Sequence, residues 1–286
     1  MRELKPSQFP ALLKEIPQKD IPEKLYLEGE LPDNDMKFLA VVGARKYTPY
    51  GKEACEKIIA GLRGYPIVIV SGLALGIDGI AHRAALDAGL RTIAVPGSGL
   101  HPQHIYPASH RQLAKQILES GGALLSEFEP KHPTYPWNFP QRNRIMAGMC
   151  HATLLIEAEK KSGTMITARL AAEYNRDVLV VPNSIFSKTS EGPHLLMRIG
   201  AAPITSSSDL LQELGFEPST KPSQQNLFAD CSSAEIELLK LLETSPLPRD
   251  EMIRQSKKSA SEVNALLSLM EIKGIIKESN GEIRQN

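Results

Sequence analysis

The chain of 286 residues has few cysteines and no long apolar run, and both absences exclude classes of protein. Its three cysteines, Cys55, Cys150 and Cys231, never form a C-x-x-C pair, so their spacing predicts neither a zinc site nor a disulfide framework. The N-terminus lacks the apolar core of a signal peptide, and no run approaches the roughly 18 apolar residues that span a membrane. We therefore expect a cytoplasmic protein with no membrane partner.

The chain also lacks an excess of charge of either sign. Lysine plus arginine and aspartate plus glutamate each number 33, so the formal net charge is zero. A nucleic-acid site would therefore have to arise from local segregation of charge. The apolar share of 42% allows a sizeable core, and the length suits one large domain plus a small one.

Between residues 37 and 216, short apolar runs alternate with amphipathic patterns. The runs are nearly continuous and rich in β-branched residues, as in strands buried on both faces: 38–44, 66–72, 92–97, 122–127, 152–158, 177–183 and 202–204. Helical patterns lie at 51–62, 78–89, 109–121, 167–175 and 192–200. Such alternation predicts βαβ units, and hence an α/β domain with a doubly wound, mostly parallel sheet.

The segments on either side of this domain have different compositions. Residues 1–36 are rich in proline and charge, with one short helical pattern, FPALLKEI, and predict an N-terminal arm over the larger domain. Residues 217–233 are typical of a linker. Residues 234–286 contain three helical patterns and a hairpin pattern that turns at Asn280-Gly281. Three helices and a hairpin predict a small winged-helix-like domain.

Ligands of an open α/β sheet bind beyond the carboxyl ends of the strands, where this sequence repeatedly places glycine-rich turns. Such turns allow backbone N–H groups to approach a phosphate. The candidate phosphate-binding residues in them are Gly43, Arg45, Lys46, Gly72, Gly76, Ser162, Gly163 and Thr164. None of the turns completes a P-loop or a dinucleotide fingerprint, so we expect no nucleotide cofactor.

Acidic residues are absent from three stretches, 36–52, 88–118 and 130–156, although each contains lysine and arginine. Because their loops fall at one edge of the expected sheet, they predict a basic groove that can follow a polyphosphate backbone. The third stretch contains FPQRNR. These stretches add six candidate DNA-binding residues: Arg111, Phe139, Gln141, Arg142, Asn143 and Arg144.

Aromatic residues are scarce, at 5%, yet six gather in or beside these stretches: Tyr47, Tyr50, Tyr106, Tyr135, Trp137 and Phe139. Rings between basic side chains suit single-stranded nucleic acid, whose bases stack for about 1–3 kcal/mol each. The alternative is that each ring closes the core beneath the loops. We expect Phe139 to be exposed and Arg142 to contact a phosphate. Arg144 either holds DNA or braces the loop.

Other polar groups have structural alternatives to a catalytic role. Asp78 and His82 are four residues apart on an expected helix, which suits a base and its orienter, but a surface pair is the favoured interpretation. Glu157 suits either a nucleotide hydrolase or a cap of the next helix, and the cap is favoured. Three histidines lack a nearby carboxylate, so no metal site is expected: His101, His104 and His110.

Six segments have the order and spacing typical of the DNA-processing protein A (DprA/Smf) family: VVGARKYTPYG, IVSGLALGIDGIAHRAAL, GSGLHPQHIYP, LLSEF, FPQRNRIMAG and IEAEKKSGTMITARLAAEYNRDVLVVP. The chain resembles this family over about residues 20–215, and its tail resembles the family's winged-helix-like domain. The resemblance implies an extended Rossmann-like domain, a homodimer and binding of single-stranded DNA. It also implies protection of incoming DNA in natural transformation, loading of the recombinase RecA, and no catalysis or cofactor.

The resemblance places the groove on the Arg45 loop, the Gly72–Asp78 turn and the Phe139–Arg144 segment. The chain differs from many members in its short N-terminal segment and in Val-Pro-Asn, not Val-Pro-Gly, at 181–183. The enzyme alternative is a nucleotide phosphoribohydrolase on a related scaffold, but FPQRNR has no place in that pattern. We therefore expect a non-enzymatic recombination mediator.

The last expected helix, 259–274, is poor in basic residues. It carries Glu262 and Glu271, with Lys273 as its only base. A winged helix that reads duplex DNA inserts this helix into the major groove. The sequence therefore predicts that the C-terminal domain binds protein rather than duplex DNA.

Overall fold

The computed structural model describes residues 1–286 except 33–34, 218–231, 243–244, 257, 280 and 286. It divides into two compact units, Met1–Pro218 and Ser219–Asn286. The linker predicted at 217–233 falls mostly outside the described residues.

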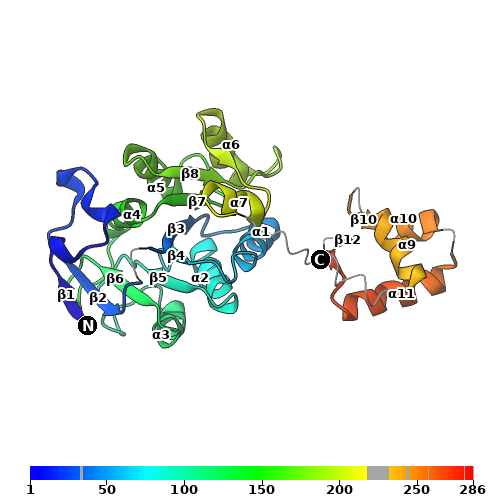
Figure 1. The fold of residues 1–286 in the computed structure, drawn as a ribbon, viewed down its shortest axis with the longest axis horizontal. Coiled ribbons are helices and arrows are strands. Elements are labelled where there is room, and N and C mark those ends of the chain that lie inside the picture. Colours follow the sequence, from blue (N-terminus) through cyan, green and yellow to red (C-terminus); the bar gives the residue numbers. More distant parts are fainter. Residues whose placement is uncertain (33–34, 218–231, 243–244, 257, 280, 286) are drawn as a thin grey trace. The chain divides into compact units, whose positions relative to one another are not determined.

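Among the described residues of the first unit, the strands form one nine-stranded sheet in the order β1-β2-β6-β5-β4-β3-β7-β8-β9 (Figure 1). The strands from β3 onward run parallel and match the predicted runs: β3 (Lys37–Val42), β4 (Ile67–Ser71), β5 (Arg91–Ala94), β6 (Ala123–Ser126), β7 (Ala152–Leu155), β8 (Asp177–Val180) and β9 (Ala202–Pro203). The chain winds from β3 to β6 on one side and from β7 to β9 on the other. The predicted doubly wound α/β sheet is confirmed.

Two apolar cores cover the faces of this sheet, because successive side chains of a strand point to opposite faces. In β3, Phe38, Ala40 and Val42 belong to one core, whereas Leu39 and Val41 belong to the other. The first core takes side chains from α4 (Asn138–Met149), α5 (Gly163–Glu173) and α6 (Glu191–Arg198). The second takes them from α1 (Pro49–Ala60), α2 (Ile77–Asp87) and α7 (Ser207–Glu213). A smaller cluster lies under α3 (Arg111–Glu119).

The sequence predicts α1, α2, α3, α5 and α6, but FPQRNR is not among its helical patterns. The motif lies in α4. Pro140 falls at the third helical position, where a missing N–H costs no hydrogen bond within the helix. The proline therefore marks the start of a helix and not a break.

The N-terminal segment is part of the sheet. Its strands β1 (Arg2–Leu4) and β2 (Leu25–Gly29) pair with each other, and β2 pairs with β6, all antiparallel. FPALLKEI contains a 3-10 turn, Leu12–Lys14, rather than an α-helix. Leu13 and Ile16 pack against Gly148 of α4. The expected arm thus lengthens the sheet and covers α4.

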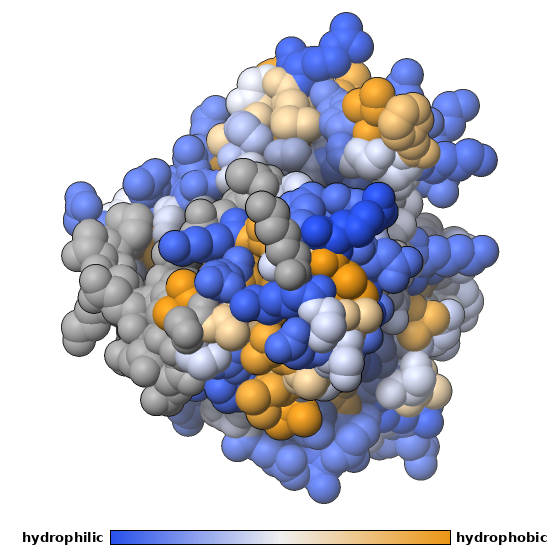
Figure 2. All heavy atoms as spheres, turned by 90° about the vertical axis from the view of Figure 1, so that its right-hand side faces the viewer, coloured by the Kyte–Doolittle hydropathy of each residue, from blue (hydrophilic) through white to orange (hydrophobic). Residues whose placement is uncertain are grey.

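The second unit has the predicted winged-helix arrangement. Its described residues form the helices α9 (Ser233–Leu241), α10 (Arg249–Ser256) and α11 (Ala260–Ile272) and the strands β10 (Leu247–Pro248), β11 (Ile276–Ser279) and β12 (Glu282–Gln285). The β11–β12 pair is the expected antiparallel hairpin, with Asn280 of its predicted turn outside the described residues. The unit has an apolar core of its own. Figure 2 shows hydrophobic side chains grouped within a largely hydrophilic surface.

His82 and Asp78 are both buried in the first unit, so the predicted surface pair is wrong. Nδ1 of His82 lies 2.7 Å from Oγ1 of Thr92, which donates a hydrogen bond to the Ile69 carbonyl. Burial lowers the pKa of His82 to about 3 from an ordinary value of 6.5. The imidazole is therefore neutral in the folded protein.

This histidine should make stability depend on pH. The unfolded state gains a proton at His82 below pH 6.5, whereas the folded state does not until about pH 3. The contribution of neutral His82 to the free energy of unfolding is therefore fully present above pH 6.5. Below that value the free energy of unfolding falls by up to about 1.4 kcal/mol for each unit that the pH drops. Urea titrations between pH 7 and about pH 5, where most carboxylates stay ionised, should show this slope. His82→Gln should flatten it, and the partly exposed His104→Gln is the control. Equal slopes for wild type and His82→Gln would contradict the assignment.

Candidate nucleic-acid interface

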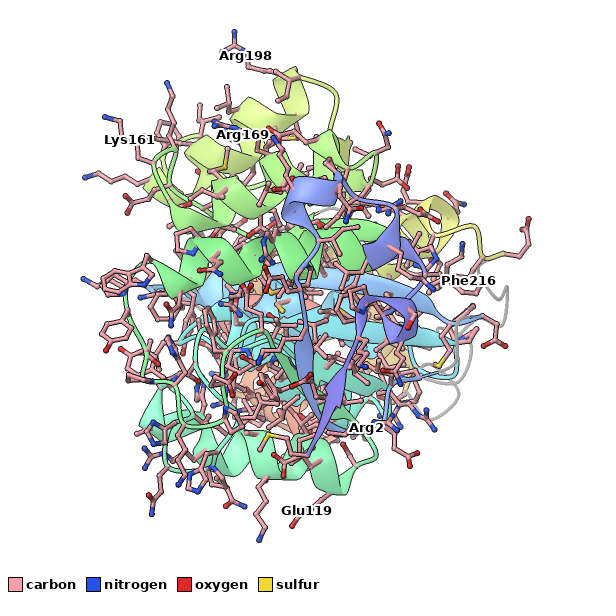
Figure 3. The ribbon with its side chains drawn as sticks, turned by 90° about the vertical axis from the view of Figure 1, so that its left-hand side faces the viewer. Arg2, Glu119, Lys161, Arg169, Arg198 and Phe216 are labelled. Atoms are coloured by element: carbon pink, nitrogen blue, oxygen red, sulfur yellow. The ribbon has the colours of Figure 1, made fainter. Side chains whose placement is uncertain are left out.

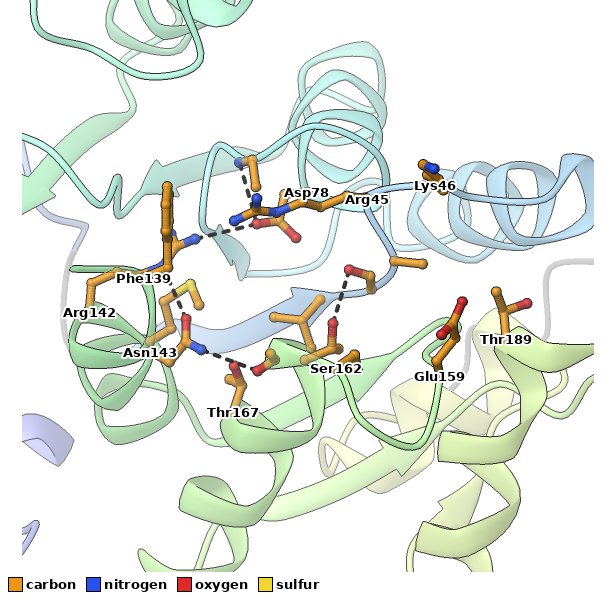
Figure 4. A pocket seen from close by; sticks show the side chains of 17 residues that line it. Arg45, Lys46, Asp78, Phe139, Arg142, Asn143, Glu159, Ser162, Thr167 and Thr189 are labelled. Carbon is orange, nitrogen blue, oxygen red and sulfur yellow. Dashed lines mark hydrogen bonds and ion pairs between the residues drawn. The ribbon is translucent and has the colours of Figure 1, made fainter. Parts of the chain in front are cut away.

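A pocket of about 380 Å³ opens at the carboxyl ends of β3 and β7, where the strand order reverses (Figure 4). This is the usual ligand position in a doubly wound sheet. Nine predicted site residues line it: Gly43, Arg45, Lys46, Phe139, Arg142, Asn143, Ser162, Gly163 and Thr164. Arg45, Asp78 and Arg142 lie on one side of the pocket in Figure 4, and Ser162 and Thr167 lie on the other.

Two predicted glycines, Gly72 and Gly76, shape the pocket without lining it. A Cβ atom on Gly72 would collide with the Arg142 guanidinium. Gly76 has a φ of +83°, and a Cβ there would collide with the Ala44 carbonyl. These glycines are therefore needed for close packing, and their predicted contact with a phosphate is not supported by the geometry.

Arg142 is 4% exposed, and its predicted role as a free phosphate contact is wrong. Its guanidinium donates to the Val95 carbonyl and, from Nε, to Oδ1 of Asn143 at 3.1 Å. Its Nη2 lies 3.8 Å from Oδ2 of Asp78. Burial lowers the pKa of Arg142 to about 10, which leaves it charged at neutral pH. Burial raises the pKa of Asp78, and the charge of Arg142 opposes that rise.

The remaining polar residues of FPQRNR have separate positions. Arg144 donates to Glu127 at 2.6 Å, and both side chains are largely buried, which favours the bracing alternative over DNA contact. Nδ2 of Asn143 donates to the Gly163 carbonyl at 3.3 Å and ties α4 to α5. Gln141 is exposed and lies outside the lining of the pocket.

Phe139 is half-buried, so the prediction of an exposed ring is wrong. The Arg45 guanidinium lies over the ring, with its carbon 4.7 Å from the centroid. The ring also packs against Gly97, where a Cβ would come within 2.9 Å of it. A guanidinium over an aromatic face is attracted by the ring quadrupole. Arg45 is nevertheless exposed, so its charge remains accessible at the mouth of the pocket.

The N-terminus of α5 faces the same pocket. Ser162 occupies the N-cap position, but no side chain caps the helix, so first-turn N–H groups of Gly163 and Thr164 are open to an anion. The Thr164 hydroxyl donates to the Gly43 carbonyl at 3.1 Å and fixes the two turns together. Figure 3 shows Lys161, just before α5, and Arg198, at the end of α6, extending outward from the unit.

Glu157 is buried and holds the Arg45 loop in place. It accepts hydrogen bonds from N and Oγ1 of Thr48, at 2.7 and 2.9 Å, and from Oγ1 of Thr189 at 3.1 Å. Thr48 caps α1, so the role of Glu157 is structural, but the predicted cap of the next helix, α5, is wrong because no side chain caps that helix. Thr189 and Glu159 also line the pocket and were not predicted, since neither follows a glycine-rich turn.

The predicted residue Arg111 lies outside this pocket. It is exposed, donates to the Gln103 carbonyl, and lines a neighbouring hollow on the far side of Phe139. Of the three histidines, His110 is buried with Nδ1 2.9 Å from the Leu73 carbonyl. Within the part of the chain that is described, no group of three or more His, Cys, Asp or Glu residues could hold a metal ion. In the same part, no helix is long and apolar enough to cross a bilayer.

Substitution of Arg142 and of Arg45 should lower the free energy of unfolding by different amounts. Arg142→Ala leaves the Asp78 carboxyl buried without its partner, so the free energy of unfolding should fall by about 3–5 kcal/mol. Arg45→Ala removes an exposed guanidinium and should cost only about 0.5–1 kcal/mol. Urea unfolding monitored by circular dichroism measures both. Similar losses for the two variants would contradict the buried position of Arg142.

Comparison with known proteins follows the division into two units. Residues 2–215 match the family model of DNA recombination-mediator protein A, and residues 217–282 match that of the DprA winged helix domain. Protein Smf of Escherichia coli is 43% identical over 197 residues, which cover 69% of this chain and 52% of Smf. DNA processing protein DprA of Streptococcus pneumoniae is 41% identical over 208 residues, 73% of this chain and 72% of that protein.

Two solved structures agree with these relationships. DprA from Streptococcus pneumoniae superposes with a TM-score of 0.68 at 39% identity, over 74% of each chain. The structure of Helicobacter pylori DprA, described for its single-stranded DNA binding mode, superposes with a TM-score of 0.65 at 30% identity, over 74% of this chain and 94% of that one. With a family match over residues 2–215, the chain belongs to the DNA recombination-mediator protein A family, together with the DprA and Smf proteins.

Proposed function

We propose that the chain binds single-stranded DNA in the pocket at the ends of β3 and β7. The observation that carries this proposal is the convergence of two exposed cations, Arg45 and Lys46, with the uncapped N-terminus of α5 around one pocket. The single-stranded DNA binding of the Helicobacter pylori relative supports it. The site would take a phosphate of the DNA backbone.

The proposed contacts do not depend on base sequence. Arg45 and Lys46 neutralise phosphates, and N–H groups of Gly163 and Thr164 donate to phosphate oxygens. The buried pair of Arg142 and Asp78 forms the floor, and Phe139 supports Arg45 from below rather than stacking as a free ring. Exposed Glu159 is an acid at the rim and opposes the cations.

We propose further that the chain acts without catalysis. Two carboxylates near the pocket are already engaged, Asp78 beside Arg142 and Glu157 with Thr48. A nucleotide phosphoribohydrolase is the alternative. Release of free base from nucleoside monophosphates by the purified protein would overturn the non-enzymatic proposal.

The proposed role of the bound DNA is to receive RecA during natural transformation, while the protein protects it. Family membership supports a part in recombination. RecA filament assembly on DNA already coated with a competing single-strand-binding protein is the decisive assay. Assembly that is no faster with this protein than without it would refute the loading role.

A homodimer would place two such sites on one strand. Its support is the exposure of large apolar side chains around α6: Ile185 at 79%, Phe186 at 92% and Ile199 at 73%. Light scattering should give twice the mass of one chain for the wild type and a lower average mass for Phe186→Ser. A monomeric wild type at micromolar concentration would refute the dimer.

The winged-helix unit is proposed to bind protein. Lys273, the only base of its last helical segment, donates to Glu235 at 2.8 Å, and α11 exposes Leu269 at 45% and Ile272 at 84%. A helix with these exposed groups is poorly suited to duplex DNA, whose phosphates attract lysine and arginine. A large loss of duplex affinity on deletion of residues 217–286 would overturn this assignment.

DNA binding should be steeply dependent on salt and on Arg45. Affinity for oligo-dT, measured by fluorescence anisotropy, should fall linearly on a plot of log affinity against log salt concentration. Arg45→Ala should weaken binding by about tenfold and reduce the slope by about 0.7, the value for one phosphate contact on a single strand. Lys115→Ala, an exposed lysine on α3 paired with Glu119, is the matched control and should leave both unchanged. Binding insensitive to salt, or equal effects of the two substitutions, would contradict the site.

A further inference from the structure

A second hollow, of about 430 Å³, adjoins the pocket and shares one residue with it. Phe139 lines both. The other walls come from the loop before α3, with Tyr106, from the start of α3, with Arg111, and from the loop before α4, with Tyr135. The lining contains Arg111 and His104 but no carboxylate. The hollow is therefore aromatic and basic.

A ladder of rings fixes one wall of this hollow to the core. Phe128 is buried, and His132 stacks on it with centroids 4.9 Å apart and planes 13° apart. Tyr135 meets His132 edge-on at 5.7 Å, and Trp137 lies parallel to Tyr135 at 4.7 Å and 4°. Each ring restrains the next, so the outermost ring is held in place before any ligand arrives.

Trp137, at the outer end of the ladder, is 64% exposed. The alternative role, closing the core beneath the loops, does not fit a ring with most of its surface in water. Removing apolar surface from water stabilises a fold by about 25 cal/mol for each Å², and an exposed indole does not contribute this free energy. A restrained, exposed ring has the properties of a stacking platform, because little side-chain entropy is left to lose on binding.

Tyr106 connects this platform to the first pocket. Its ring is 47% exposed and lies 5.9 Å from that of Phe139, which carries Arg45 on another side. Exposed charge and exposed rings therefore follow one another from Arg45 through Tyr106 to Trp137. A strand whose phosphate occupies the first pocket meets aromatic faces as it leaves.

We propose that this hollow, together with the Trp137 ring stacked on its wall residue Tyr135, is a second subsite for single-stranded DNA, in which bases stack on Trp137 and Tyr106 while Arg111 faces a phosphate. It rests on the proposed function, since the strand is anchored in the first pocket. The subsite binds bases through their faces, so it accepts any sequence but requires that bases be present.

Trp137 is the only tryptophan of the chain, so its emission reports on this subsite alone. Full-length protein is titrated with oligo-dT, and anisotropy of the labelled strand is recorded together with tryptophan emission. We expect emission to be quenched in step with binding. An abasic strand of equal length has the same phosphates and should bind without quenching. Bound oligo-dT that leaves the emission unchanged would overturn the subsite.

Substitutions of Trp137 test how much stacking on this ring contributes to the affinity for DNA. Trp137→Ala should weaken binding of long oligo-dT by about tenfold, which corresponds to one stacked base. Trp137→Tyr should restore most of that loss. In a series of increasing length, wild type and Trp137→Ala should have equal affinity for short strands and separate once a strand reaches the second hollow. Tyr47→Ala is the matched control, because Tyr47 is 45% exposed and lines neither hollow, and, unlike Trp137, it does not stack on the lining residue Tyr135.

The outcomes separate this inference from the proposed function. Oligo-dT that fails to bind at all refutes both. Binding that is lost in Arg45→Ala but equal in wild type and Trp137→Ala at every length refutes the second subsite and leaves the first pocket intact. Because Trp137 is exposed, Trp137→Ala should unfold at the same urea concentration as the wild type. A lower urea midpoint for the variant would mean that its loss of DNA affinity comes from impaired folding.

Discussion

One guanidinium, that of Arg142, joins the elements on which the rest of the pocket depends. It is bound by the carbonyl of Val95 after β5, by Asn143 beside it on α4, and by the carboxyl of Asp78 on α2. Gly72 has no side chain, and its absence leaves the space that the guanidinium fills. A buried arginine without these partners would cost several kcal/mol. The buried charge therefore fixes α4 against the sheet and positions Phe139 under Arg45.

Some basic side chains of this site are buried in ion pairs that stabilise the fold, whereas others stay exposed to solvent. The net charge of the chain does not reveal this difference. The acid-free stretch 130–156 is paired with acids from outside it: Arg142 with Asp78, which is remote in sequence, and Arg144 with Glu127, which lies just before the stretch. Arg45, in contrast, lies over an aromatic ring and stays exposed. A ring orients the guanidinium without neutralising it, so its charge can still attract a phosphate.

The sequence predicts the sheet well because buried parallel strands are continuous apolar runs, and each of the seven runs from 38–44 to 202–204 became a strand. It predicts which loops converge, because parallel strands end at one edge. It does not predict which side chains of a loop are exposed. Arg142 and Phe139 were misassigned because their partners, Asp78, Val95 and Gly97, are remote in sequence. The strands β1 and β2 were missed because their apolar patterns are short and interrupted by charge.

The last strand of the large sheet, β9, has two residues and ends at Pro203. Proline has no N–H to offer a further strand, and a strand this short presents few unpaired backbone groups. At the opposite edge, β1 has only three residues. The sheet is thus terminated at both edges, which disfavours backbone pairing between copies of the chain and protects it from edge-to-edge aggregation. Any specific association of the large unit must then be encoded in side chains.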